Sequence, residues 1–240
     1  MGIDVWVQRG VAAGAALVET ATGTADAAAF EHDRRGSEAV AVRSPADSGT
    51  RGDALAALAR EVAACEACAL ARTRTQTVFG VGAPAARCLV IGEAPGAEED
   101  RRGEPFVGRA GQLLNSMLAA IGLARESVYI ANILKCRPPG NRDPQVEEVL
   151  ACRNFLTRQV ALIAPQVILA VGRIAAQNLL GVDTPIGRLR GQEHTYGDTA
   201  VPVVVTYHPA YLLRSPGEKR KAWSDLLRAR RILEAAGDDL

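Results

Sequence analysis

The chain has 240 residues, of which 48% are hydrophobic and 23% are charged, a composition that is ordinary for a globular protein. Its formal net charge of +1 excludes a strong attraction of the whole chain to polyanions, so any binding of nucleic acid must come from a local basic surface. The sequence has no apolar run of about eighteen residues that could span a bilayer, and its start lacks the pattern of a secretion signal. We therefore expect a cytoplasmic protein without a membrane partner.

Five cysteines in a chain of this kind favour metal binding or free thiols over a disulfide framework. Cys65 and Cys68 form a C-x-x-C pair, and Cys136 and Cys152 follow later in the chain. Such a pair can hold one side of a metal centre while two cysteines from other segments complete four thiolates. The spacing is compatible with an iron-sulfur cluster and with structural zinc, and does not separate the two. Cys88 lies in an apolar segment and is expected to be a core thiol.

Residues 1–51 are rich in Ala, Gly, Thr, Asp and Arg and show no sustained helical or strand period. Such a segment buries too little apolar surface to offset the entropy lost on ordering, so we expect a disordered N-terminal extension. The folded domain is expected over residues 52–240. It begins with a helix that Asp53 caps and that ends at the C-x-x-C pair.

Downstream, apolar segments alternate between strand and helix patterns. Strands are predicted over residues 87–91, 127–134, 166–171 and 201–207, and helices over 112–121, 145–163, 172–180 and 216–235. The last helix is amphipathic, and we expect Trp223 on its buried side. Because parallel strands need helical crossovers, this alternation predicts an α/β fold with a mainly parallel four-stranded sheet and helices on both faces.

Polar side chains gather where the predicted strands end. The first strand runs into a carboxylate-rich loop that contains Glu93, Glu99 and a single aromatic residue, Phe106. Asn132 and His208 stand near the ends of two other strands. Open α/β sheets bind ligands beyond the carboxyl ends of their strands, so we expect a site here. An isolated Phe commonly serves packing alone and an isolated His is commonly structural, so the residue types leave the chemistry open.

Four motifs occur in order along the chain: GEAPGAEED (92–100), PFVGRAGQLL (105–114), ANILKCRPP (131–139) and HPAYLLRSP (208–216). Together with the cysteines they resemble the family 4 uracil-DNA glycosylases. The resemblance implies a three-layer αβα sandwich and a [4Fe-4S] cluster bound by Cys65, Cys68, Cys136 and Cys152, with zinc as the alternative. It also implies a DNA repair reaction, the hydrolysis of the N-glycosidic bond of deoxyuridine in DNA, which releases uracil and leaves an abasic site.

The resemblance also assigns roles to single residues. Asn132 reads the N3–H and O4 of a flipped uracil, and His208 donates to O2 as negative charge develops there. Ala94 stands where other branches of the superfamily place an aspartate that activates water, so leaving-group stabilisation is expected to dominate. The expected catalytic residues are Glu93, Asn132 and His208. The expected substrate-binding residues are Ala94, Gly96, Glu99, Phe106, Asn132, Leu212 and Arg214.

Contacts with DNA are expected around the mouth of this site. Leu212 is predicted to wedge into the gap left by the flipped nucleotide, and Lys135 and Arg214 are predicted to contact phosphates. The expected partner is uracil-containing DNA, single- or double-stranded, bound by a monomer. A relative that traps the abasic product through a histidine on an inserted loop is disfavoured, because residues 138–149 contain neither the insertion nor a histidine, so turnover is expected. The alternative that stays open is a uracil- or damage-binding DNA module with a structural metal site and no turnover.

Overall fold

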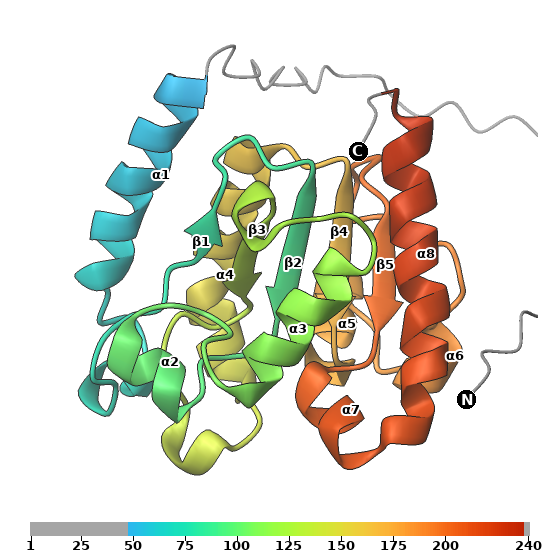
Figure 1. Ribbon diagram of the computed structural model, residues 1–240. Helices are drawn as coiled ribbons and strands as arrows, with labels where there is room; N and C mark the ends of the chain where they lie inside the picture. Colours follow the sequence, from blue (N-terminus) through green and yellow to red (C-terminus); the bar gives the residue numbers. More distant parts are fainter. Residues whose placement is uncertain (1–47, 238–240) are drawn as a thin grey trace, which may run out of the picture. The chain divides into compact units, whose positions relative to one another are not determined.

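The computed structural model describes residues 48–237 (Figure 1). At its centre lies a five-stranded sheet in the order β1-β3-β2-β4-β5. The strands are β1 Val81–Gly82, β2 Cys88–Gly92, β3 Tyr129–Asn132, β4 Val167–Val171 and β5 Val203–Thr206. The four longer strands are parallel, as predicted, whereas β1 pairs antiparallel with β3 at the edge. The prediction of a four-stranded sheet is therefore wrong, because a two-residue strand is too short to show a period in the sequence.

The described segment has helices before, between and after the strands, and those between the parallel strands are the crossovers. The helices are α1 Ser48–Ala63, α2 Ala97–Arg102, α3 Arg109–Ala119, α4 Val146–Ile163, α5 Arg173–Leu180, α6 Ile186–Leu189, α7 Pro209–Arg214 and α8 Lys219–Ala235. Short 3₁₀ turns occupy Ala69–Arg72, Arg125–Ser127, Pro139–Asn141 and Pro216–Glu218. None of the helices within residues 48–237 combines the length and the apolar character needed to cross a membrane.

Strand side chains alternate between two cores, one on each face of the sheet. Val90, Leu169 and Val204 belong to the first core, which α3, α7 and α8 cover. Leu89 and Ile168 belong to the second core, which α1, α4, α5 and α6 cover. Figure 1 shows α3 and α8 in front of the sheet and α4 behind it. This arrangement confirms the three-layer αβα sandwich.

The start of the first helix differs from the prediction. α1 begins at Ser48, so residues 48–51 are helical and Asp53 lies inside the helix instead of capping it. A tertiary contact holds this first turn, since Arg51 Nη1 donates to the Ile163 carbonyl at the end of α4 at 3.2 Å. The remainder of the expected extension, residues 1–47, lies outside the described residues.

The last helix buries a different stripe from the one expected. Ala222, Leu226, Ala229 and Leu233 face the core, at the spacing of one helical face. Trp223 follows Ala222 directly and is therefore rotated by about 100° around the helix, which leaves it 41% exposed. The prediction that Trp223 is buried is wrong.

Candidate functional site

A cavity of about 510 Å³ opens at the carboxyl ends of the parallel strands, within the usual size range of small-molecule sites. The loop after β2, the end of β3 and the segment after β5 all contribute to its wall. Of the predicted catalytic and substrate-binding residues, all except Leu212 line it: Glu93, Ala94, Gly96, Glu99, Phe106, Asn132, His208 and Arg214. The fold therefore gathers four sequence-distant motifs around one space.

Asn132 ends β3 and is only 2% exposed. Among the described residues its side-chain amide has no hydrogen-bond partner, although buried amides are normally paired. Gly92 lies opposite it in the sheet, and a Cβ there would come within 2.4 Å of Asn132 Oδ1 and 2.7 Å of Phe106 Cζ. The glycine thus lets amide and ring approach each other, and the amide can offer a donor and an acceptor to a ligand.

His208 is the N-cap of α7, and its Nδ1 accepts from the Ala210 backbone N–H at 3.1 Å. The ring proton of the neutral tautomer therefore resides on Nε2. Burial lowers the pKa of His208 to about 4, the nearby Arg214 cation adds to this shift, and Glu99 opposes it. At neutral pH the imidazole is an uncharged hydrogen-bond donor.

Phe106 supplies an aromatic wall. Its ring centroid lies 5.6 Å from that of His208 with an interplanar angle of 30°. Its backbone is left-handed, with φ of 54°, which is uncommon for a bulky residue and characteristic of functional sites. Gly111 permits this turn, because a Cβ at that position would lie 1.8 Å from the Phe106 carbonyl oxygen. The planar face that results suits a planar ligand.

The two glutamates of the cavity differ in their surroundings. Glu99 Oε1 accepts from the backbone N–H groups of Val107 at 3.0 Å and Gly108 at 3.3 Å, which fixes its direction. Burial raises the pKa of Glu93 to about 7; the Asp143 carboxylate adds to this rise and Arg173 opposes it. Glu93 therefore changes charge near neutral pH.

The cavity also contains residues that the sequence did not indicate, among them Asn141 and Asp143. They lie on the loop after β3, which Arg142 ties to α4 through Glu148, with Nη2–Oε1 and Nη1–Oε2 distances of 2.5 and 2.9 Å. Asn141 has a left-handed backbone with φ of 55°. The position of this loop directly after a parallel strand was the available signal.

The predicted wedge, Leu212, is 1% exposed and packs in the core beneath α3 and α8. The segment after His208 is helical, and Leu212 lies on the inner side of α7. Its neighbours Tyr211 and Leu213 are each 37% exposed, and Tyr211 also lines the cavity. The assignment of Leu212 as the wedge is therefore wrong.

Lys135 is likewise not at the surface, so the predicted phosphate contact is wrong. The residue is 1% exposed, and its Nζ donates to the Asn132 backbone carbonyl at 2.8 Å. Burial lowers the pKa of Lys135 to about 8, and the neighbouring Cys152 opposes that shift. Lys135 is an internal cation next to the cysteines.

Cys65, Cys68, Cys136 and Cys152 line a second cavity together with Arg74 and Lys135. The free space between these side chains is about 10 Å³, far smaller than that of the first cavity. Two N–H groups point at sulfur: Arg74 Nη1 lies 3.3 Å from Cys136 Sγ, and the Lys135 backbone N lies 3.3 Å from Cys152 Sγ. Burial raises the pKa of Cys152 to about 11 and also raises that of Cys136, so both are neutral thiols unless a cation binds.

The cysteines surround this cavity instead of meeting at a point. Within residues 48–237, no three His, Cys, Asp or Glu side chains converge closely enough for a single metal ion. One zinc ion needs its four sulfurs at about 2.3 Å from a common centre, whereas a cluster binds each thiolate through a different iron atom. Four cysteine sulfurs are donors that suit both structural zinc and an iron-sulfur cluster, so the chemistry of this donor set fits either group. Cys88 lies apart from it in β2, where burial raises the pKa of its thiol to about 12.

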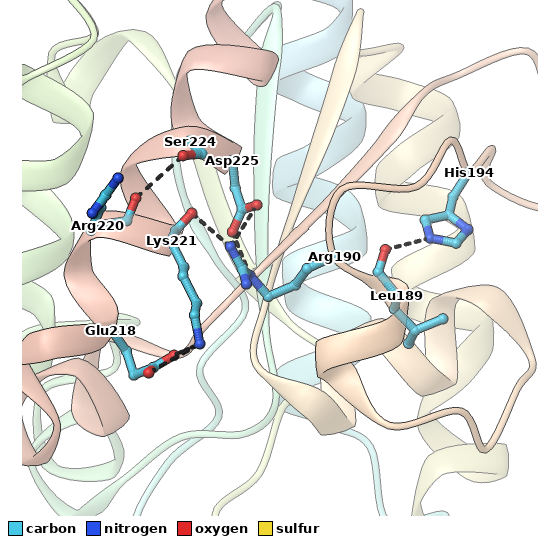
Figure 2. Close-up of polar contacts among 8 residues, drawn as sticks. All are labelled: Leu189, Arg190, His194, Glu218, Arg220, Lys221, Ser224 and Asp225. Carbon is cyan, nitrogen blue, oxygen red and sulfur yellow. Dashed lines mark hydrogen bonds and ion pairs between the residues drawn. The ribbon is translucent and has the colours of Figure 1, made fainter.

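A buried ion pair joins Arg190 to Asp225 of α8 (Figure 2). Arg190 Nε and Nη2 contact the two carboxylate oxygens of Asp225 at 2.7 and 3.0 Å, and Nη2 also donates to the Lys221 carbonyl at 2.6 Å. The guanidinium lies 4.4 Å from the ring centroid of Tyr207, whose ring is 5.1 Å from that of Tyr211. Arg190 thus connects α8 to Tyr207, the residue before His208, and the Tyr207 ring in turn packs on Tyr211 of the cavity wall.

Replacing Arg190 with alanine is expected to lower the free energy of unfolding by about 3–5 kcal/mol, because it leaves the Asp225 carboxylate buried without its partner. Urea denaturation measures this loss. The matched control is Arg158→Ala, which breaks an ion pair with Glu61 whose side chains are 41% and 50% exposed. That change should cost at most about 1 kcal/mol. Equal losses in the two variants would contradict the supporting role of Arg190.

The fold and the cavity together define an α/β protein with a site for a planar heterocycle beside a four-cysteine centre. The sequence profile of the Uracil DNA glycosylase superfamily matches residues 79–227. The chain is 48% identical to a type-4 uracil-DNA glycosylase of Archaeoglobus fulgidus over 70% of its own length and 87% of the relative. It is 40% identical to a type-4 uracil-DNA glycosylase of Thermotoga maritima, over 78% of its own length and 99% of the relative. The chain therefore belongs to the type-4 family of uracil-DNA glycosylases.

Proposed function

We propose that this protein is a DNA repair glycosylase that hydrolyses the N-glycosidic bond of deoxyuridine in DNA. It releases free uracil from a flipped-out nucleotide and leaves an abasic site. The observation that carries the proposal is the unpartnered amide of Asn132 in the same cavity as the neutral imidazole of His208. Family membership supports the reaction, since the relatives at 39–48% identity are type-4 uracil-DNA glycosylases.

Recognition begins with the flipped base, because uracil inside a duplex cannot reach a cavity. The ring stacks on Phe106, and the Asn132 amide accepts from N3–H and donates to O4. Cytosine presents the opposite pattern at these two atoms. Binding it would leave the Asn132 amide mispaired in a buried position, which supports strong discrimination.

Bond cleavage leaves negative charge on uracil and positive charge on the sugar. The Nε2–H of His208 donates to O2 as that charge develops, and its fixed direction means that no reorganisation is needed. The Glu93 carboxylate stabilises the oxocarbenium-like sugar and positions the water. Glu99, held by two backbone N–H groups, shapes the cavity near C5 of uracil. Ala94 offers no carboxylate, so stabilisation of the leaving group carries most of the rate.

The four-cysteine cavity is proposed to hold a [4Fe-4S] cluster through Cys65, Cys68, Cys136 and Cys152. When bound, the cluster cross-links the segment after α1, the loop after β3 and helix α4, and adds negative charge between them. Arg74 and Lys135 donate to two of the sulfurs, as partners of ligating thiolates commonly do.

The proposed substrate is uracil in single-stranded or duplex DNA. A monomer is proposed as the functional unit. The test is incubation of cluster-loaded protein with uracil-containing oligonucleotides of both kinds, followed by detection of free uracil and of alkali-labile abasic sites. Binding without release would favour the alternative, a damage-binding module without turnover.

The turnover rate is expected to rise with pH through about 7. The pKa of Glu93 is raised to about 7, so the carboxylate that stabilises the sugar is present above this pH and lost below it. In Glu93→Gln the pH dependence should disappear and the rate should stay low throughout. The same variant should melt at a higher temperature than the wild type at alkaline pH, because it no longer buries an ionised carboxylate. If the rate of Glu93→Gln still falls at low pH, the fall in rate is due to a group other than Glu93.

Leu213 replaces Leu212 as the proposed wedge, because it is the exposed leucine of α7. Leu213→Ala is expected to slow excision from duplex DNA more than from single strands, since only the duplex must be held open. Its unfolding free energy should change little. The control Leu212→Ala should instead lose about 2–5 kcal/mol of stability. Equal slowing on both substrates would exclude the wedge.

A further inference from the structure

Lys135 joins two parts of the molecule that the proposed reaction uses separately. The residue is 1% exposed, and its Nζ donates to the backbone carbonyl of Asn132 at 2.8 Å. Its backbone N–H donates to Cys152 Sγ at 3.3 Å, and the residue lines the cysteine cavity. One residue therefore contacts both the base reader and the cysteine centre.

The two contacts are made by opposite ends of the same residue. The backbone N–H of Lys135 donates to the Cys152 sulfur, and its side chain folds back so that Nζ donates to the carbonyl of Asn132. N–H groups that donate to ligating sulfurs are part of the shell that orients a metal centre. An ordered Cys152 sulfur therefore orders the Lys135 backbone, and with it the contact to Asn132.

The backbone carries this effect to the rest of the cavity. Beyond β3, Ile133 N donates to the Gly92 carbonyl at 2.9 Å, and Leu134 N donates to the Glu93 carbonyl at 3.1 Å. Residues 132–135 thus form one hydrogen-bonded strand end that is tied to the loop carrying Glu93. The position of Lys135 therefore bears on the distance between the Asn132 amide and the Glu93 carboxylate.

We propose that Lys135 is a positioning residue through which the cysteine centre holds the Asn132 amide in place for uracil. The inference rests on the proposed function and deepens it. It makes the centre part of base recognition as well as a cross-link between segments. Because coupling between two sites is reciprocal, uracil binding and metal retention favour each other.

The test compares two variants that each remove a cation beside a cysteine sulfur. Lys135→Met removes the donor to Asn132, whereas Arg74→Met removes the donor to Cys136 and leaves the Asn132 contact intact. With cluster content matched by iron assay and visible absorbance, Lys135→Met should lose about 10- to 100-fold in single-turnover excision rate. Inhibition by free uracil should weaken in Lys135→Met and stay normal in Arg74→Met.

A second measurement does not depend on catalytic activity, and its result for the wild type tests the proposal even if Lys135→Met folds poorly. The wild type is exposed to an iron chelator, and loss of visible absorbance is timed with and without an oligonucleotide that contains a slowly cleaved, 2′-fluorinated deoxyuridine. We expect the oligonucleotide to slow metal loss in the wild type and in Arg74→Met, and to have no such effect in Lys135→Met. Absence of protection in the wild type would overturn the coupling.

The outcomes separate this inference from the function on which it rests. If loaded wild-type protein releases no uracil, the proposed function fails. If it releases uracil and Lys135→Met matches Arg74→Met in rate and in uracil inhibition, only the coupling through Lys135 fails.

Discussion

Replacing Asn132 with alanine is expected to lower the single-turnover rate of uracil excision by about 10²- to 10³-fold, the usual cost of removing one preorganised hydrogen-bonding group. The amide is almost fully buried and has no partner among residues 48–237, so it is held ready for a ligand. Its truncation leaves N3–H and O4 of uracil unpaired in a closed space. The rate is measured by quenched-flow release of labelled uracil.

The control for Asn132 is Asn141→Ala, which removes a second amide of the same cavity. Asn141 Oδ1 already accepts from Arg137 Nε at 2.8 Å, and its residue lies on the exposed loop after β3. We expect a much smaller loss in rate for this variant. Near-normal turnover of Asn132→Ala, or equal losses in both variants, would remove Asn132 from base recognition.

His208→Ala is expected to produce a loss of similar size, about 10²- to 10³-fold, because one donor to the developing charge on O2 is removed. The pKa of His208 is lowered to about 4, so this donor stays neutral and keeps its Nε2–H throughout the neutral range. No break in the pH–rate profile should therefore come from His208 near its ordinary pKa of about 6.5. The low pKa also means that folding stability is lost as the pH falls from about 6.5 through about 4.

His194→Ala serves as the control for His208. His194 Nε2 contacts the Leu189 carbonyl at 2.8 Å (Figure 2). His194 lines a different cavity from the one that contains His208. This variant should retain normal turnover. An acid limb in the wild type that disappears in His208→Ala would show that the charged imidazole matters, contrary to the proposed mechanism.

Much of the fold was predictable because the hydrophobic pattern of each strand and helix lies within its own stretch of sequence. Buried strands rich in β-branched residues and helices between them follow from hydrophobic period, and the predicted segment 145–163 agrees with α4 almost to the residue. Gln145 caps that helix through a capping box with Glu148. The edge strand β1 was not predictable, because two residues form it through pairing with β3 alone.

The sequence predicted which residues belong to the candidate site better than it predicted which way their side chains face. Motifs at strand ends identified the residues that the topology brings together. The burial of Leu212 and Lys135 depends on which side of a short helix or strand end faces inward, and tertiary packing decides that. Asp143 enters the cavity on a loop that the Arg142–Glu148 ion pair ties to α4, and its own ion pair with Arg173 at 2.7 Å ties it to α5. No local pattern records such contacts.

Phe106 has a left-handed backbone, and two glycines that do not contact the base in the proposed complex hold its ring in place. The substrate range of this cavity is therefore sensitive to changes at these glycines. Gly111 lies against the Phe106 carbonyl, and Gly92 lies against both the Phe106 ring and the Asn132 amide. A single methyl group at either glycine would tilt the aromatic wall or the reading amide. Alanine variants at positions 92 and 111 are thus a short mutational route to altered base preference, which a survey restricted to base-contacting side chains would overlook.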